Sequence, residues 1–281
     1  MSAPSNMARP PDDVGRHYDE LDAFYRDVWG EHLHHGLWVS GRETPEEAAW
    51  RLADFVIEES GVKDGDAVCD VGCGYGATAR RLAQEHGARV TALTVSEAQY
   101  DYARSLGGDI SYRLQDWLAN DLPASSFDTV IAIECASHMA DQHRFIEEAY
   151  RVLRPGGRLV ACAWLASDDP AAWQQRLLLE PIIREGKLSG LEPAAAYHQW
   201  IADAGFAGEA FQDLSRQVRR TWRVCLRRLA GKLLTDHGYR QYLLDAANTN
   251  RQFPITMGRL YAAYWTGAMR YGVFTAHRPT T

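Results

Sequence analysis

Three glycines at alternating positions follow a short apolar run of the chain. The run Val68-Cys69-Asp70-Val71 carries one carboxylate, and Gly72, Gly74 and Gly76 come directly after it. Glycine allows a tight turn of the backbone, and it lets a ligand approach where a Cβ would stand in the way. A carboxylate before such a loop suits a ligand with a cationic end better than it suits a pyrophosphate. The pattern therefore predicts a binding site for a ligand with a cationic end.

A histidine that follows a later apolar run could move a proton. His138 comes after the run Thr129–Cys135, and a histidine near neutral pKa is the usual agent that deprotonates an oxygen nucleophile. The alternative role for His138 is to cap a helix that we expect to begin at Gln142. Three more histidines stand close together nearer the N-terminus: His32, His34 and His35. Because no second cluster of metal ligands accompanies them, we expect no metal site.

The elements that position these residues alternate between strand and helix. Apolar runs between turn residues predict strands at 67–71, 89–95, 110–114, 129–135 and 158–164, and helical patterns lie between several of them at 77–86, 96–106 and 142–153. This alternation predicts βαβ units with a parallel sheet that is covered on both faces. In such a sheet, ligands bind at the carboxyl ends of the strands. The glycine loop and His138 should both lie at that edge.

Segments with helical patterns flank this core on both sides. Thr44, Pro45 and Glu47 predict the start of a helix that Gly61 ends. After Trp164 the alternation gives way to helical patterns, the first of them at 170–185. The run at 210–214 could be a strand, and a final apolar run at 271–277 could return to the sheet as another. We therefore expect an α/β fold with a doubly wound, mostly parallel, Rossmann-like seven-stranded sheet and a helical cap over the active site.

Composition excludes several classes of partner and compartment. The 281 residues carry a net charge of −7, so we expect neither nucleic acid nor stable association with an anionic membrane. Five cysteines, an odd number without a CxxC pair, argue against a disulfide framework and for a reducing cytoplasm. The N-terminus has no apolar signal region, and no run of about 18 apolar residues occurs. We expect a cytoplasmic protein, and the sequence leaves a homo-oligomer open.

Several stretches of the chain resemble one enzyme family. The stretch 68–76 resembles the first motif of class I S-adenosylmethionine (SAM) dependent methyltransferases, and Leu153–Gly157 is similar to a later turn of that family. The stretch 18–38 resembles the N-terminal segment of tocopherol-type methyltransferases and, more loosely, phosphoethanolamine methyltransferases and cyclopropane fatty-acid synthases. The block Ile133–Asp141 is similar to a motif of tocopherol-type and of sugar or antibiotic O-methyltransferases. The resemblance implies SAM as the cofactor and a small-molecule acceptor.

This resemblance implies three divisions of the chain. We expect a helical N-terminal lid at residues 1–60 and a SAM-binding core at 61–165. Helical cap insertions and the last strands of the sheet should make up residues 166–281.

The chain departs from most class I enzymes after the second expected strand. Most members hold the ribose hydroxyls of SAM with an acidic residue there, whereas this chain has Thr94. The tocopherol and cyclopropane branches share a Thr-x-Ser-x-x-Gln pattern, which Thr94, Ser96 and Gln99 match. A hydroxyl and an amide can hydrogen-bond a diol in place of a carboxylate. The same departure argues against an NAD(P)-dependent oxidoreductase, the alternative that the glycine loop alone would allow.

Two further places complete the cofactor site that the resemblance implies. Asp116 would accept a hydrogen bond from the adenine amino group and Trp117 would lie against the ring, although Asp116 could instead cap a helix. A loop that covers SAM in the resembling enzymes corresponds to the histidine-rich stretch. The residues expected at the cofactor are His35, Gly36, Asp70, Gly72, Gly74, Gly76, Thr94, Gln99, Asp116 and Trp117.

The catalytic candidates follow from the same resemblance. In the resembling families the histidine matched by His138 faces the substrate, and Tyr18 aligns with a tyrosine that partners a catalytic histidine in phosphoethanolamine methyltransferases. Glu134 lies in the same motif as His138, and packing in the lid is the alternative for Tyr18. We expect O-methylation with His138 as general base. C- or N-methylation of a prenyl, phosphorylated or amine acceptor and a non-catalytic SAM-binding protein are the alternatives.

Six arginines lie within the segment 216–228. If the segment is a helix, Val218, Trp222 and Cys225 form an apolar stripe, and the arginines mostly form a solvated face. Binding of a phosphate by some of these arginines is the alternative.

Overall fold

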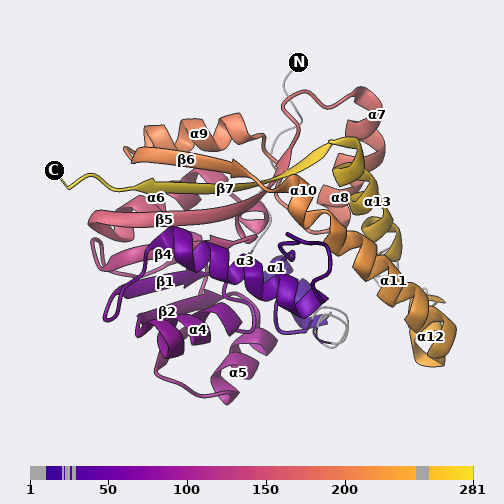
Figure 1. Ribbon diagram of the computed structural model, residues 1–281, viewed down its shortest axis with the longest axis horizontal. Helices are drawn as coiled ribbons and strands as arrows, with labels where there is room; N and C mark the ends of the chain where they lie inside the picture. Colours follow the sequence, from indigo (N-terminus) through magenta and orange to yellow (C-terminus); the bar gives the residue numbers. More distant parts are fainter. Residues whose placement is uncertain (1–10, 21, 23–25, 27–29, 245–252, 281) are drawn as a thin grey trace.

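A seven-stranded sheet forms the centre of the molecule (Figure 1). The computed structural model describes residues 11–20, 22, 26, 30–244 and 253–280. The strands are β1 (Ala67–Val71), β2 (Arg89–Thr94), β3 (Ile110–Leu114), β4 (Phe127–Ile133), β5 (Leu153–Ala166), β6 (Ala207–Asp213) and β7 (Met269–His277). Their order is β3-β2-β1-β4-β5-β7-β6. Strands β1 to β5 pair in parallel, and β7 runs antiparallel between β5 and β6. The predicted fold is confirmed.

Helices cover both faces of the sheet because its strands are apolar on both sides. Val68 and Ile131 pack in one buried layer with α3 (Pro45–Ser60) and α4 (Ala77–His86). Their chain neighbours Cys69 and Val130 lie in the opposite layer with α6 (Gln142–Val152) and α9 (Ala194–Asp203). Successive side chains of a strand point to opposite faces, so each uninterrupted apolar run supplies both layers. A further helix, α5 (Glu97–Ser105), packs near β2 and β3.

Local signals set the start and the end of α3. Thr44 Oγ1 accepts a hydrogen bond from the Glu47 backbone N–H at 3.1 Å, and the Glu47 carboxylate accepts one from the Thr44 N–H at 2.7 Å. Gly61 ends the helix at a φ of 63°, a left-handed conformation that glycine adopts without strain. The helix packs against β4 and β5. A helix that we expected in the lid therefore belongs to a layer on the sheet.

The later part of the chain forms a helical lobe beside the sheet (right side of Figure 1). Its helices are α7 (Ala172–Gln174), a π-helical turn (Gln175–Leu179), α8 (Glu180–Glu185), α10 (Ser215–Val218), α11 (Arg220–Thr235), α12 (His237–Leu244) and α13 (Phe253–Thr266). Chain continuity fixes its place, because α13 leads directly into Met269, which pairs with Ala166 at the carboxyl end of β5. The lobe thus stands at the sheet edge where the ligand site is expected.

The helix expected at 170–185 is interrupted in the structure. Pro181 lies in the first turn of α8, directly after the π-helical turn. Proline lacks a backbone N–H, and its ring crowds the carbonyl four residues earlier, so a wider turn relieves the conflict. At the other end of the chain, α1 (Pro11–Glu20) packs against α5. Within the described residues, the helices are too short or too polar to cross a membrane.

Candidate active site

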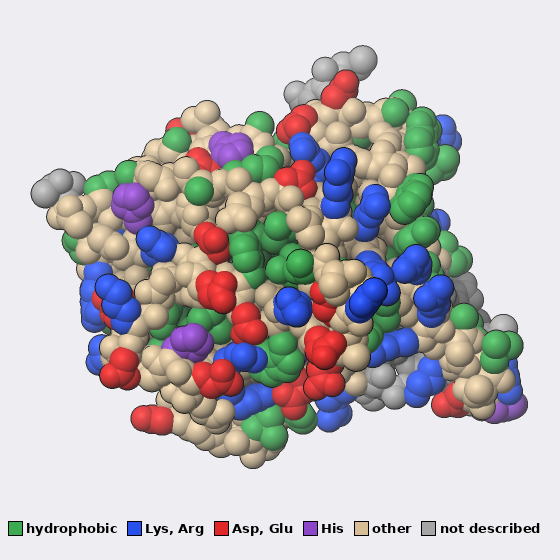
Figure 2. All heavy atoms as spheres, viewed as in Figure 1, with side chains coloured by type: hydrophobic (Ala, Val, Ile, Leu, Met, Phe, Trp, Pro, Cys, Tyr) green, Lys and Arg blue, Asp and Glu red, His purple; other side chains and the backbone are tan. Residues whose placement is uncertain are grey.

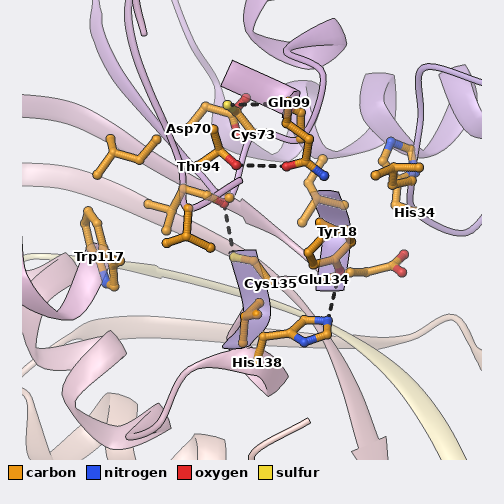
Figure 3. Close-up of a pocket in the computed structure, with 18 of the residues that line it drawn as sticks. Tyr18, His34, Asp70, Cys73, Thr94, Gln99, Trp117, Glu134, Cys135 and His138 are labelled. Atoms are coloured by element: carbon orange, nitrogen blue, oxygen red, sulfur yellow. Dashed lines mark hydrogen bonds between the residues drawn. The ribbon is translucent and has the colours of Figure 1, made fainter. Parts of the chain in front are cut away.

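A cavity of about 150 Å³ opens at the carboxyl ends of the parallel strands (Figure 3). Ten of the residues predicted from the sequence line it: Tyr18, Asp70, Gly72, Gly74, Thr94, Gln99, Asp116, Trp117, Glu134 and His138. They come from α1, from the end of β1 and the loop after it, from the end of β2 and the first turn of α5, and from the segments after β3 and β4. Three predicted residues, His35, Gly36 and Gly76, lie outside this lining.

Asp70 brings a buried carboxyl group to the wall of the cavity. Only 3% of the residue is exposed, and its Oδ2 has no hydrogen-bond partner among the described residues. Burial raises the pKa of this carboxyl to about 7. A buried carboxylate without a partner is costly, and a cation in the cavity would relieve that cost. The prediction of a ligand with a cationic end rests here on a second, structural observation.

The glycines after β1 serve different purposes. Gly72 has a φ of 69°, and a Cβ there would lie 2.5 Å from the Cβ of Cys135. Gly74 has a φ of 55°, and a Cβ there would meet no atom within 4 Å. Gly72 is therefore required by packing against the segment after β4, whereas Gly74 leaves open space at the cavity wall. Gly76 precedes the first turn of α4 and packs against Tyr112.

Thr94 and Gln99 form a buried pair at the end of β2. The Thr94 hydroxyl donates to Gln99 Oε1 at 2.8 Å and accepts from the Ser96 backbone N–H at 3.2 Å. Ser96 caps α5, since its Oγ accepts from the Gln99 backbone N–H at 3.2 Å. The pair fixes the orientation of the Gln99 amide, and the N–H donors of that amide lie on the side away from Thr94 (Figure 3).

Asp116 and Trp117 bound the cavity beyond β3. Asp116 Oδ1 accepts from the Leu118 backbone N–H at 3.0 Å and caps the short 3-10 helix Trp117–Ala119. The capping role that the sequence left open is thus present, and the residue lines the cavity as well. The Trp117 indole N–H donates to the Phe145 carbonyl at 3.2 Å. This bond and burial of all but 2% of the residue hold the indole in place.

His138 and Tyr18 form a hydrogen-bonded pair at the edge of the cavity (Figure 3). The Tyr18 hydroxyl lies 3.0 Å from His138 Nε2, and His138 Nδ1 lies 3.4 Å from the Lys187 carbonyl oxygen. A carbonyl can only accept, so Nδ1 carries the proton and Nε2 accepts from Tyr18. Burial lowers the pKa of His138 to about 4 and raises that of Tyr18. Near neutral pH the pair is therefore an uncharged imidazole that faces an uncharged phenol.

Glu134 lies directly after β4 in a left-handed backbone conformation with a φ of 60°. Its Oε1 accepts from the His35 backbone N–H and from the Tyr271 hydroxyl, both at 2.8 Å. Its Oε2 accepts from the Trp164 indole at 2.7 Å and from His35 Nδ1 at 2.9 Å. Burial alone would raise the pKa of the carboxyl, but the charge and hydrogen bonds of His35, together with the charge of His34, hold that pKa at about 2. This arrangement favours an anchoring role for Glu134 over proton transfer.

His35 and Gly36 fasten the segment that precedes α3 to the helical lobe. The centroid of the His35 ring lies 5.2–5.3 Å from the ring centroids of Trp164, Trp222, Tyr264 and Tyr271. The Gly36 N–H donates to Thr221 Oγ1 at 3.0 Å. The neighbouring residues Glu31–His34 line the cavity instead. The resemblance located residues 31–41, here called the covering segment, but it could not tell which of their side chains face the cavity.

Two histidines of this segment lie against each other. His32 Nδ1 lies 3.1 Å from His34 Nε2. Across the part of the chain that the structure describes, no group of three or more His, Cys, Asp or Glu side chains could hold a metal ion.

A second cavity of about 80 Å³ adjoins the first. Tyr18, Leu33, His34, Glu134 and His138 line both cavities. Its other apolar walls come from β5 and the helical lobe: Trp164, Ile182, Leu188, Trp222 and Leu260. Sequence reasoning missed these residues, because they lie far apart in the chain and share no motif. The polar side chains of His17, His35, Thr221 and Thr256 also line this cavity. The His138–Tyr18 pair stands where the two cavities meet.

The sequence of the chain is similar to those of known methyltransferases. Residues 69–161 match the methyltransferase domain family. The chain is 32% identical to 27-O-demethylrifamycin SV methyltransferase of Amycolatopsis mediterranei, over 97% of this chain and 100% of the relative. It is 26% identical to the chloroplastic tocopherol O-methyltransferase of Arabidopsis thaliana, over 95% and 82% of the two chains.

Solved structures share the fold over nearly the whole chain. A mycolic acid cyclopropane synthase complexed with SAH superposes with a TM-score of 0.85 at 19% identity, over 97% of this chain and 100% of the other. The [4+2]-cyclase SpnF superposes with a TM-score of 0.79 at 26% identity, over 98% of both chains.

Proposed function

The chain belongs to the class I SAM-dependent methyltransferases, and from that premise we propose that it methylates a hydroxyl oxygen of an apolar small molecule. SAM is its cofactor, and its relatives act on small molecules. The observation that carries the proposal is the His138–Tyr18 pair, a neutral base with its lone pair directed to a hydroxyl group. That pair lies at the junction of the two cavities.

The residues of the first cavity fit SAM in charge and in space. Asp70 would pair with the ammonium group, which supplies the partner that its buried Oδ2 lacks. The open space at Gly74 would admit the ligand against the backbone. Gln99 would donate to the ribose oxygens, and Asp116 and Trp117 would meet the adenine. Asp70 and Gln99 would then hold one molecule at two separate points.

SAM supplies a methyl group that is already activated by its sulfonium. Transfer is an in-line displacement, so alignment of the acceptor oxygen contributes much of the rate. The acceptor must also lose its hydroxyl proton. His138 Nε2 would take this proton directly, or Tyr18 would take it while donating its own hydroxyl proton to His138 Nε2. The positive charge moves from the sulfonium to the imidazole in this step. Hydrogen bonding of His138 Nδ1 to the Lys187 carbonyl supports that charge.

The second cavity supports an apolar acceptor. Apolar atoms form most of its surface, and the pair that would deprotonate the acceptor stands where it meets the first cavity. Such a pocket binds an apolar body while a few polar groups orient the reacting atom. Two of the relatives are named as acting on oxygen, the rifamycin and the tocopherol enzymes, which supports O-methylation over transfer to carbon or nitrogen.

Incorporation of methyl-labelled SAM into matched acceptors tests this proposal. The panel pairs apolar phenols and alcohols with their methyl ethers and with amines of the same carbon skeleton. We expect label in hydroxyl compounds only, with the mass spectrum placing the new methyl group on oxygen. Label on nitrogen or carbon, or label in the methyl ethers, would contradict transfer to oxygen while leaving the enzyme class intact.

A further inference from the structure

Arginine side chains gather over α10 and α11 on the outer face of the helical lobe, where Figure 2 shows a concentration of blue atoms. Four of them, Arg216, Arg219, Arg220 and Arg223, line a surface groove of about 330 Å³. The opposite wall consists of Trp38–Gly41, the end of the segment that covers the first cavity, and Trp265 lies at the rim. We call this feature the arginine groove. It shares no lining residue with the two cavities described above.

Aromatic rings fix two of the guanidinium groups. Arg220 lies over the ring of Trp38 at 4.9 Å from its centroid, and Arg219 lies over Trp265 at 4.7 Å. Stacking occupies one face of each guanidinium and leaves its N–H edge available, which suits a multidentate oxyanion. Arg220 Nε is buried and has no hydrogen-bond partner among the described residues.

Nothing described in the groove neutralises this charge. Among the described residues, no carboxylate forms an ion pair with any of the four arginines. Glu43, the carboxylate next to the loop, accepts instead from the backbone N–H groups of Val39 and Ser40. The first turns of α10 and α11 hold no acidic residue, although the N-terminal end of a helix favours acidic over basic side chains. Four cations at this place oppose one another unless an anion binds between them.

We propose that the arginine groove binds a phosphate group, carried either by a soluble organic phosphate or by the headgroup of an anionic lipid. The fork of donors on each arginine matches phosphate oxygens, and the groove is of a size that ligands fill. A bound phosphate would bridge Trp38–Gly41 to α11. This site is separate from the second cavity, which would hold the acceptor and is called the acceptor cavity below. The proposal does not depend on which atom is methylated.

Such a bridge would also act on the active site. Thr221, next to Arg220, accepts hydrogen bonds from the Gly36 N–H at 3.0 Å and from the Trp38 indole at 3.1 Å. Thr221 and Trp222 line the acceptor cavity. A phosphate held across the groove would therefore fasten the covering segment to the same turn of helix that forms the wall of that cavity.

Two probes test the proposal on the full chain and separate the two sources. Calorimetry measures binding of inorganic pyrophosphate, and co-sedimentation measures binding to phosphatidylglycerol vesicles against phosphatidylcholine vesicles. Arg219→Gln and Arg223→Gln are combined in one variant, and Arg227→Gln is the matched control, because Arg227 lies on the same helix but does not line the groove. Arg223 is exposed, so Arg223→Gln alone provides a variant with little risk to folding.

We expect at least one probe to bind the wild-type protein and the Arg227→Gln control equally. The dissociation constant should rise about tenfold for each groove arginine removed, because each removal takes away a charge-assisted hydrogen bond to the phosphate; tenfold corresponds to about 1.4 kcal/mol. Pyrophosphate should slow hydrogen exchange of residues 38–41. Binding of pyrophosphate alone identifies a soluble phosphate, and binding of anionic vesicles identifies a headgroup. Failure of both probes, or equal binding by the groove variants, or equal loss in Arg227→Gln, would overturn the proposal.

Discussion

Asp70 shows how a single residue can link a sequence motif to the chemistry of a ligand. Its position before the glycine loop suggested a cationic partner, and the structure adds burial and an oxygen without a described partner. In the free protein both features favour the neutral carboxylic acid, because no described residue stabilises the ionised form through a hydrogen bond to Oδ2 or through a counter-charge. With its pKa raised to about 7, Asp70 changes charge within the range in which binding is measured.

SAM affinity should therefore depend on pH through Asp70. The ionised form holds the ammonium group, so the dissociation constant of S-adenosylhomocysteine should fall as pH rises toward about 7 and level off above it. Asp70→Asn should weaken binding and remove most of this dependence, whereas Asp101→Asn, at an exposed position of α5, should change neither. Calorimetric titration across this range measures both effects. The same pH dependence in Asp70→Asn would exclude Asp70 as its source.

Motifs predicted which residues gather at one cavity where the motif lies at the end of a strand. Asp70, Gly74 and His138 reach one cavity because each lies at or soon after the carboxyl end of a strand of the same parallel sheet. His35 and Gly36 do not line it. In an irregular segment, one step along the chain turns a side chain to a different side, and no periodic pattern records that direction.

At the scale of elements, Glu134 joins three parts of the fold. Its carboxylate holds the covering segment through His35, strand β5 through Trp164 and strand β7 through Tyr271. The sequence showed Glu134 in a motif after the fourth strand, and the resemblance suggested catalysis. Its partners are distant in sequence, so the anchoring role becomes visible only when the strands are assembled.

Replacing Glu134 should loosen this junction. Glu134→Gln keeps the size of the side chain but removes the charge and sets an amide N–H₂ against the donors around it. We expect the free energy of unfolding to fall by about 3–5 kcal/mol, as when a buried charge pair is broken, and amide exchange of residues 34–38 to accelerate. Tyr271→Phe, which removes one donor to the charged carboxylate, should cost less, roughly 1.5–3 kcal/mol. Unfolding in urea measures the change in stability. A Glu134→Gln protein with the unfolding free energy and the amide exchange of wild type would refute the anchoring role.

The bounds of elements were predictable where local signals define them. The helix at Ala77–His86 and the strands at Ala67–Val71 and Ile110–Leu114 agree with the sequence prediction to the residue. Flanking glycines and apolar runs act on the chain within a few residues. The break before Pro181 was missed, because the helical pattern of the sequence continues through it. Proline is tolerated in the first turn of a helix, and Pro181 lies in the first turn of α8.

At the scale of the molecule, the sheet was predictable and the helical lobe was not. Apolar strands in regular alternation with helices permit few topologies, and the predicted seven-stranded sheet is the one that forms. The lobe brings together α8, α11 and α13 from a stretch of chain without alternation. Its cavity depends on packing between distant residues, which is why the sequence indicated a cap but no acceptor site.

Burial of neutral histidines should make the whole molecule sensitive to acid. The pKa is lowered by burial to about 4 for His17 and His138 and to about 2 for His32. As pH falls below about 6.5, these histidines become protonated in the unfolded chain but stay neutral in the folded protein. The unfolded state therefore binds more protons, and stability decreases. Each group adds a slope of at most about 1.4 kcal/mol per pH unit, reduced where the side chain is partly exposed.

Thermal unfolding between neutral pH and about pH 4.5 measures this loss. The midpoint should fall steadily on acidification, and His17→Asn should lessen the fall, whereas His143→Asn on the surface of α6 should not. A midpoint that stays constant over this range would mean that these histidines take up protons without unfolding.

The kcat of His138→Ala, measured together with the affinity for SAM, tests most directly whether His138 is the base for transfer to oxygen. His138 pairs with Tyr18 at the acceptor cavity, so its removal should lower kcat by roughly 10²–10⁴, the range for loss of a general base. The dissociation constant for SAM should change little, and His143→Ala should match wild type. Wild-type turnover in correctly folded His138→Ala would contradict the assignment of the base, and a large loss of SAM affinity would place His138 in the cofactor site instead.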